Sequence, residues 1–216
     1  MLKAIIMDFD GVIVDTEIVW YDIYAGWFLK NKNYHLPIQE FLICVGSSSA
    51  DLLNFLEKRH CIVVDRKQFF RDIQESFIEQ SNKLPAKNGV TQFIREVKSE
   101  GLKLALATSS TRLKPITHLT RLGLINKFDE LITAEDVERI KPNPDLFLKA
   151  AKKLGVVKDN VLIIEDSLNG LIAGVNAGMR VLVVPNKMTK DCDFTGCYKK
   201  MESLESLDLK KIMRDF

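Results

Sequence analysis

The sequence predicts an α/β fold with a doubly wound, parallel sheet at its core, and three observations support this. Four short apolar runs lack the polar alternation of a half-exposed strand, at residues 2–7, 103–107, 161–164 and 181–184. Strands that are buried on both faces of a parallel sheet have this composition. Helical patterns lie between the runs, and acidic or hydroxyl side chains directly follow three of them. Strands alternating with helices indicate βαβ units in a Rossmann-like core.

Two of the helical patterns have recognisable limits. Residues 90–99 carry a stripe of apolar side chains at helical spacing, which predicts an amphipathic helix. Residues 144–154 form a second pattern, with Asn143 as the expected N-cap and Pro144 at the first helical position. Gly155 follows this pattern as a stop signal. Both segments therefore fit helices that connect neighbouring strands of the sheet.

Two weaker patterns complete the core. Residues 130–133 form a short apolar segment that fits a further strand. Residues 201–216 have apolar side chains at helical spacing, so we expect the tail to pack on the core as a helix.

Residues 17–83 interrupt the alternation of strands and helices. They hold aromatic and leucine residues at helical spacing but no run typical of a buried parallel strand. Trp20 and Trp27 lie seven residues apart, which favours packing inside a helical unit, and Trp20 is also a candidate for substrate contact. We therefore expect a helical cap domain over residues 15–85, inserted into a core formed by residues 1–14 and 86–216.

The amino-acid composition limits which partners and which cell compartment we expect for this protein. The 216 residues are 46% hydrophobic and 28% charged, and 31 basic against 29 acidic residues leave a net charge of +2. This balance gives no reason to expect nucleic acid or a membrane as partner. The apolar runs fall short of the ~20 residues that span a bilayer, and no signal-peptide pattern precedes the first run. The four cysteines lack zinc-site spacing, so we expect a cytoplasmic monomer with reduced thiols.

The most informative motif is Asp8-Phe9-Asp10-Gly11, directly after the first apolar run. Two carboxylates this close repel each other unless a cation or a shared proton relieves them. A hard cation such as Mg²⁺ suits oxygen ligands, so the pair predicts a metal site. One acid can then attack a phosphate, and the other can protonate the leaving alcohol and deprotonate water. The alternative interpretation is an acidic loop with a structural role.

Two further polar clusters stand at the ends of predicted strands. Thr108-Ser109-Ser110 follows the run at 103–107 and can form an anion cradle, although a serine N-cap is the better interpretation of this segment alone. Glu165-Asp166-Ser167 follows the run at 161–164. Its acids can share one Mg²⁺ with Asp8 and Asp10, or the segment can be a loop in which Ser167 or Asp166 caps a helix.

A lysine lies between the second and third clusters. Lys141 precedes Pro142 and can place a fixed positive charge on a phosphate, although a single lysine is more commonly a surface residue. The carboxyl ends of parallel strands meet at one edge of the sheet, where open α/β proteins bind ligands. The combination therefore predicts that nucleophile, metal acids, hydroxyls and lysine converge on one phosphate.

With these motifs, the chain resembles the haloacid dehalogenase superfamily of phosphotransferases, in the branch of beta-phosphoglucomutase and small sugar-phosphate phosphatases. The resemblance spans nearly the whole chain, and its motifs occur in order at residues 8–17, 107–110, 140–144 and 165–170, running into 177–179. It implies a Mg²⁺-dependent enzyme whose helical cap closes over a small phosphorylated metabolite.

The resemblance also implies individual roles. Asp8 is the expected nucleophile, Asp10 the general acid and base, Ser109 a ligand of the transferring phosphoryl group, and Lys141 the residue that neutralises its charge. The metal ligands are then Asp8, Asp10 through its backbone carbonyl, Glu165 and Asp166. Substrate contacts are expected from Thr16, Gly46, Ser49, Thr108 and Ser110.

One position separates two activities within this branch. Ser49 stands where mutases of the branch carry an arginine that grips a second phosphate, and serine cannot supply a bidentate cation. We therefore expect hydrolysis of a small phosphomonoester, a sugar phosphate in particular, through an aspartyl-phosphate intermediate. A phosphoglucomutase is the alternative enzyme, and a phosphate-binding protein without catalysis is the alternative outside enzymes.

Overall fold

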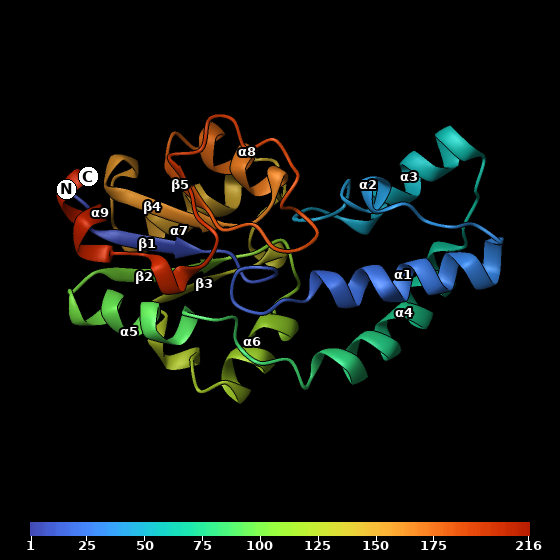
Figure 1. Cartoon of the computed structure of the whole chain (residues 1–216), viewed down its shortest axis with the longest axis horizontal. Helices are drawn as coiled ribbons and strands as arrows, with labels where there is room; N and C mark the ends of the chain where they lie inside the picture. Colours follow the sequence, from blue (N-terminus) through green and yellow to red (C-terminus); the bar gives the residue numbers. More distant parts are fainter.

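The computed structural model describes residues 1–216, apart from the side chains of residues 78 and 79. Its core is a parallel sheet in the order β3-β2-β1-β4-β5-β6, which confirms the predicted doubly wound α/β fold (Figure 1). The strands are β1 (Ala4–Met7), β2 (Lys103–Ala107), β3 (Glu130–Ile132), β4 (Val161–Glu165), β5 (Arg180–Val183) and β6 (Lys199–Lys200). β1 lies in the middle because each of its neighbours pairs with it residue by residue.

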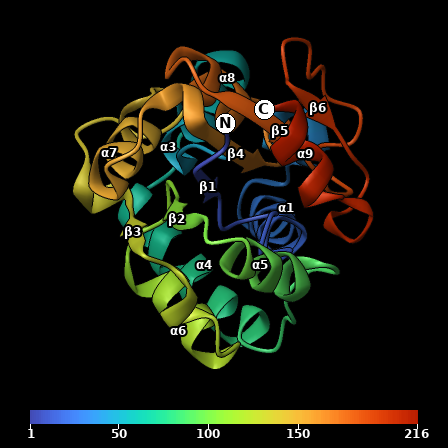
Figure 2. The same cartoon turned by 90° about the vertical axis from the view of Figure 1, so that its left-hand side faces the viewer.

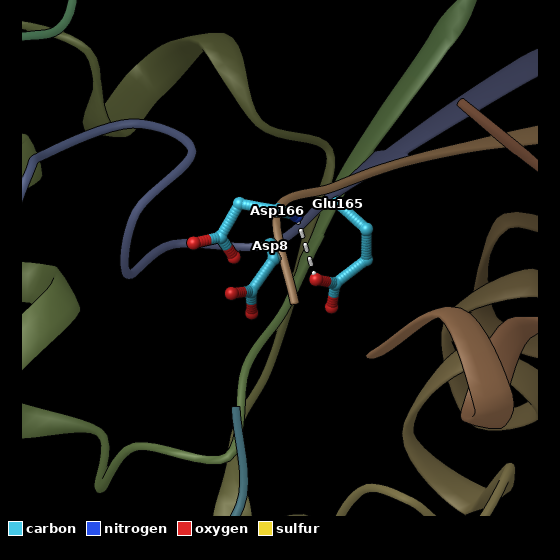
Figure 3. Close-up of side chains that lie close together, drawn as sticks. All are labelled: Asp8, Glu165 and Asp166. Carbon is cyan, nitrogen blue, oxygen red and sulfur yellow. Dashed lines mark hydrogen bonds between the residues drawn. The ribbon is translucent and has the colours of Figure 1, made fainter. Parts of the chain in front are cut away.

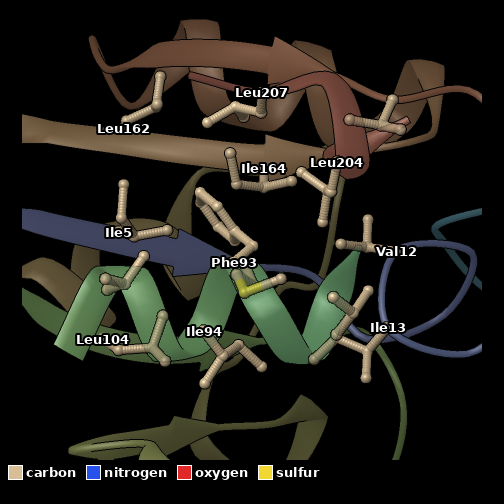
Figure 4. Close-up of a cluster of buried hydrophobic side chains, with 14 of the residues drawn as sticks. Ile5, Val12, Ile13, Phe93, Ile94, Leu104, Leu162, Ile164, Leu204 and Leu207 are labelled. Atoms are coloured by element: carbon tan, nitrogen blue, oxygen red, sulfur yellow. The ribbon is translucent and has the colours of Figure 1, made fainter. Parts of the chain in front are cut away.

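Helices cover both faces of the sheet, as Figure 2 shows. α5 (Val90–Ser99), α6 (Leu113–Arg121) and α9 (Leu209–Asp215) pack on the face that Ile5 points to (Figure 4). α7 (Asp145–Leu154) and α8 (Leu168–Asn176) pack on the face of Ile6. Successive side chains of a strand point to opposite faces, so β1 contributes to two separate apolar layers.

The segment between β1 and α5 is helical, as the sequence predicts. It contains α1 (Glu17–Lys32), α2 (Ile38–Phe41), α3 (Ser49–His60) and α4 (Arg66–Ser81), which extend beyond the carboxyl edge of the sheet (Figure 1). These helices bury their own apolar cluster, which includes Phe28, Phe41, Leu52, Leu56 and Phe69. We refer to them as the cap. Among the described residues, no helix of the chain is both long and apolar enough to span a bilayer.

The chain crosses between core and cap at two adjacent points. Val14 forms an isolated antiparallel bridge with Ala86, and the Lys87 backbone N–H donates to the Ile13 carbonyl over 2.8 Å. The outgoing and returning segments therefore run side by side, as a hinge requires. This pairing supports our proposed division into a core of residues 1–14 and 86–216 and a cap of residues 15–85.

Two local predictions need correction, and one strand was not predicted. Asn143 is not the N-cap of α7: Pro144 holds that position, while the Asn143 amide donates to the Ile140 carbonyl over 3.2 Å. The tail folds as a 3₁₀ turn at Leu204–Ser206 followed by α9, rather than as one helix. The edge strand β6 was not predicted, because its two lysines are exposed and carry no apolar signal.

Candidate active site

The strand register brings the predicted polar clusters to one edge. Met7 at the end of β1 pairs with Leu106 of β2 on one side and with Ile164 of β4 on the other. The residues that follow these strands therefore begin at the same level of the sheet. The Asp8 backbone N–H donates to the Ile164 carbonyl over 3.0 Å, which fixes Asp8 beside the end of β4.

Three of the predicted metal ligands meet there. Asp8, Glu165 and Asp166 are buried, and each offers a carboxylate oxygen within 4.8 Å of the others (Figure 3). Backbone N–H groups of Asp166 and Ser167 donate to Glu165 Oε2 over 2.9 and 3.1 Å. The Asn186 amide donates to Asp166 Oδ2 over 2.6 Å. The carboxylates are thus held in fixed orientations, which favours binding of a cation.

Lys141 is buried against the same group. Its Nζ donates to Asp8 Oδ1 over 2.5 Å, to Glu165 Oε1 over 2.7 Å and to the Ala107 carbonyl over 2.9 Å. Burial lowers the pKa of an ammonium, but the charges of Asp8 and Glu165 outweigh this and hold the Lys141 pKa above its usual value. The lysine therefore carries a permanent positive charge beside the proposed nucleophile.

This single lysine leaves the three acids with excess negative charge. Burial raises the pKa of Asp8 to about 7, with Lys141 opposing the shift and Glu165 and Asp10 adding to it. Burial and the charges of Glu165 and Asp8 raise the pKa of Asp166 well above its usual value. A divalent cation would relieve this repulsion, and an all-oxygen donor set fits Mg²⁺. The residues present therefore fit the predicted metal.

The Asp10 carboxylate does not join this group, which corrects the expectation of four carboxylates around one cation. It accepts hydrogen bonds from Ser110 Oγ over 2.6 Å and from Thr16 Oγ1, and it pairs with Lys114 Nζ over 2.5 Å. Burial alone would raise the Asp10 pKa, but Lys114, Ser110 and Thr16 bring it below its usual value. These donors turn the side chain away from the cation site, so only the backbone carbonyl of Asp10 remains a predicted ligand.

A cavity of about 620 Å³ opens above these groups, between core and cap. Apart from Thr16 and the buried Lys141, the expected catalytic and substrate-binding residues line it. The lining includes Asp8, Asp10, Gly46, Ser49, Thr108, Ser109 and Ser110. Thr16 is fully buried and reaches the site only through Asp10, so it is not placed to contact substrate. This is a correction to its expected role.

One residue of the hydroxyl cluster contacts the cap, while the other two bond to each other. Ser109 Oγ donates to the Gly46 carbonyl over 3.1 Å, and Thr108 Oγ1 accepts from the Ser110 backbone N–H over 3.1 Å. α6 begins only at Leu113 and its N-cap residue makes no side-chain cap bond, so the serine N-cap alternative is wrong. In the third cluster, however, Ser167 caps α8 by accepting from the Gly170 N–H over 3.0 Å.

Two glycines allow close approach at this site. Gly11 has a φ of +73°, and a Cβ there would lie 1.9 Å from Asp166 Oδ2. Gly46 also has a φ of +73°, and its Cβ would lie 2.2 Å from Ser167 Oγ. Any other residue would be strained at these backbone angles and would collide with the acidic loop after β4.

Sequence reasoning missed several residues of the site. Asn186 follows the run at 181–184, so its place after a buried strand was a usable signal. Lys114 is a single lysine on a helix and has no distinguishing pattern. Glu17 ends the motif at residues 8–17, but no role was assigned to it there. Glu17 is buried and lines the cavity, and burial together with the Asp10 charge raises its pKa to about 8.

Comparison with known proteins agrees with this geometry. The sequence pattern described as haloacid dehalogenase-like hydrolase matches residues 5–184. YhcW of Bacillus subtilis, whose name assigns it provisionally to the phosphatases, is 35% identical over 214 residues, covering 99% of this chain and 97% of YhcW. A Thermotoga maritima protein named phosphorylated carbohydrates phosphatase is 30% identical over 184 residues, covering 82% of each chain.

A solved structure gives the same result for the fold. The beta-phosphoglucomutase of Clostridium difficile superposes with a TM-score of 0.83 at 26% identity, covering 99% of this chain and 96% of that one. The family pattern covers residues 5–184, which is most of the sequence. The chain therefore belongs to the haloacid dehalogenase-like hydrolase family.

Proposed function

We propose that this protein is a Mg²⁺-dependent phosphatase that hydrolyses a small phosphomonoester through a phosphoryl group carried on Asp8. The observation that carries the proposal is the buried group of Asp8, Glu165 and Asp166 with Lys141 in contact, at the floor of a cavity that Asp10 also lines. The names of YhcW and of the Thermotoga relative support a phosphatase. The latter name also supports a sugar phosphate as substrate. We further propose, from the composition alone, that the enzyme is a monomer in the cytoplasm.

The reaction has two steps. An oxygen of the Asp8 carboxylate attacks phosphorus, the bond from phosphorus to the ester oxygen breaks, and the leaving alcohol takes a proton from the Asp10 carboxyl. Because Lys114, Ser110 and Thr16 keep Asp10 ionised in the free protein, Asp10 takes up this proton from solvent before the step. A water then gives its proton to Asp10 and attacks the same phosphorus, which releases inorganic phosphate and restores Asp8. When bound, Mg²⁺ would supply positive charge that lets an anionic carboxylate approach an anionic phosphate.

The remaining residues orient these groups. Ser110, Thr16 and Lys114 donate to Asp10 and fix its direction, while Lys141 balances negative charge at Asp8. Glu165 and Asp166 would hold the metal with Asp8. Ser109 would release the Gly46 carbonyl and donate to a phosphoryl oxygen when substrate enters.

Hydrolysis is favoured over the mutase reaction by the surroundings of Ser49. Its Oγ lies 2.5 Å from the Tyr24 hydroxyl, so it is engaged with the cap. Among the described residues that line the cavity, none is an arginine. A bisphosphate intermediate would therefore lack the bidentate partner that a second phosphate needs.

The first test is Asp8→Asn with an aryl phosphate as substrate. We expect loss of phosphate release to background, because an amide cannot attack phosphorus. The control Asp145→Asn changes a half-buried acid that pairs with Arg139 outside this site, and it should keep parental activity. Retained turnover in Asp8→Asn would contradict the assignment.

A second test separates hydrolysis from the mutase reaction. Incubation of the parent protein with β-glucose 1-phosphate and a bisphosphate primer should yield free phosphate, whereas conversion to glucose 6-phosphate would show a mutase.

A further inference from the structure

The cap side of the cavity is an aromatic wall. Trp20 of α1 and Phe77 of α4 stack face to face, with ring centroids 3.7 Å apart and planes within 4°. Both line the cavity, and apolar side chains continue to its rim, where Phe70 and Leu113 are 40% and 74% exposed. Large apolar side chains left exposed around a cavity commonly mark a contact surface for a ligand. Phe77 is only 5% exposed, so it supports Trp20 from behind, and the part-exposed Trp20 ring is the apolar surface that the part of the substrate beyond the phosphate meets.

The same cavity has little free positive charge. Among the described residues that line it, Lys114 is the one lysine or arginine. Its Nζ pairs with Asp10 over 2.5 Å and lies 4.8 Å from the Phe77 ring and 5.4 Å from the Trp20 ring. His118 adds no charge at neutral pH, because burial lowers its pKa. A second anionic group on the substrate would thus find no uncommitted cation.

We propose that the stacked pair Trp20–Phe77, with Lys114 committed to Asp10, is the specificity element of this site. It selects monophosphate esters of uncharged, ring-shaped alcohols that lay one flat apolar face on the wall, and it excludes substrates with a second phosphate. The ring face can be the C–H face of a sugar or the face of a heteroaromatic base, since both stack on aromatic side chains. The inference rests on the proposed phosphatase activity and narrows its substrate class.

The test compares kcat/KM for phosphate release, with Mg²⁺ present, across matched substrates. Glucose 6-phosphate and uridine 5′-monophosphate carry the two kinds of ring, glycerol 3-phosphate is the acyclic comparator, and glucose 1,6-bisphosphate adds a second phosphate to the sugar arm. We expect a preference of about tenfold for at least one ring over glycerol 3-phosphate. We expect the bisphosphate to be about 100-fold poorer than glucose 6-phosphate, since its second dianion stays unpaired.

Two variants assign the selectivity to this wall. Trp20→Leu should remove the preference for the ring over glycerol 3-phosphate, whereas Trp27→Leu should keep it. Trp27 lies on the same helix but outside the cavity lining, with its indole bonded to Asp72.

A second pair of variants tests the exclusion of a second phosphate. Gln74→Arg should raise the ratio of bisphosphate to monophosphate turnover about tenfold by adding a cation to the lining. Gln68→Arg, on the same helix outside the lining, should leave that ratio unchanged.

The outcomes separate this inference from the proposed function. Equal turnover of ring, acyclic and bisphosphate substrates would overturn the inference while the phosphatase assignment stands. An unchanged ring preference in Trp20→Leu, or an unchanged bisphosphate ratio in Gln74→Arg, would also overturn it. Gln74 is exposed, so if Trp20→Leu does not fold, Gln74→Arg still tests the exclusion of a second phosphate, and the substrate comparison in the parent still tests the ring preference. Failure to hydrolyse any phosphomonoester would overturn both.

Discussion

Glu17 shows how single residues of this site work against folding. It sits in the first turn of α1, buried beside Asp10, and burial raises its pKa from 4.5 to about 8. At any pH between these two values, Glu17 is ionised in the unfolded chain and must therefore take up a proton when the chain folds. Its position in the cavity wall is thus maintained at a cost in stability, which is a common property of functional sites.

This residue predicts how stability varies with pH. Because the folded protein holds a proton on Glu17 that the unfolded chain releases, its contribution to the free energy of unfolding falls as pH rises from 4.5 to 8. In chelator, Glu17→Gln should be more stable than the parent at pH 7 by on the order of 2 kcal/mol. We would measure urea unfolding at intervals between pH 5 and pH 8. The free energy of unfolding of Glu17→Gln should change less with pH than that of the parent.

The matched control is Glu202→Gln, which changes an exposed carboxyl and should follow the parental profile. A Glu17→Gln protein whose stability changes with pH as steeply as the parent's would show that Glu17 ionises normally in the fold.

At the scale of elements, two core side chains, Ser109 and Asn169, bind the cap loop before α3. Ser109 Oγ donates to the Gly46 carbonyl over 3.1 Å, and the Asn169 amide of α8 donates to the Val45 carbonyl over 2.9 Å. The loop therefore closes the cavity directly over the acids. It can come this near because Gly46 has no side chain to meet Ser167.

Gly46→Ala should displace this loop. The new Cβ would lie 2.2 Å from Ser167 Oγ at a backbone angle unfavourable for alanine, so the cap cannot seat as it does in the parent. We expect kcat/KM for an aryl phosphate to fall by about 10- to 100-fold, as small misplacements of catalytic surroundings typically cause. Steady-state kinetics of the purified variant measure this directly.

Gly26→Ala is the control for this change, because it lies inside α1 with no atom within 4 Å of the added Cβ. It should leave kcat/KM unchanged and slightly favour the helix. If Gly46→Ala, Gly26→Ala and the parent have equal kcat/KM, the close approach of Gly46 to Ser167 is not needed for turnover.

At the scale of the whole molecule, sheet register, loops and cap bring distant acids together, and metal binding should therefore stabilise the fold. Free Mg²⁺ at 100 times its dissociation constant should raise the free energy of unfolding by about 2.7 kcal/mol. The melting temperature should rise by several degrees, and chelator should silence activity until Mg²⁺ is returned. Asp166→Asn should lose most of this thermal shift, while Asp145→Asn, outside the buried group, keeps it. A melting temperature indifferent to Mg²⁺ would count against the site.

The sheet can be predicted well from the sequence because each buried strand is marked by a short, continuous apolar run. Buried parallel strands need continuous apolar runs, and the polar residues after them must lie at one edge, so the meeting of Asp8, Glu165 and Asp166 could be anticipated. β6 escaped prediction because an exposed edge strand of two lysines needs no apolar run.

The direction of Asp10 could not be predicted for a different reason. It depends on Lys114, which lies 104 residues further along the chain on another helix, and on Thr16 and Ser110. No short pattern records that these three donors surround one carboxylate. Likewise, Trp20 has a helical spacing that fits cap packing, but only its stack on Phe77 above the cavity shows which surface it presents.

The central claim is that Asp8 carries the phosphoryl group and Asp10 provides the base that removes it. An aryl phosphate has a good leaving group and needs no acid, so Asp10→Ala should accept the phosphoryl group but release it slowly. Intact mass measurement after mixing with Mg²⁺ and aryl phosphate should show one added phosphoryl group, and peptide mapping should place it on Asp8. Absence of the adduct, or its location on any other residue, would contradict the account.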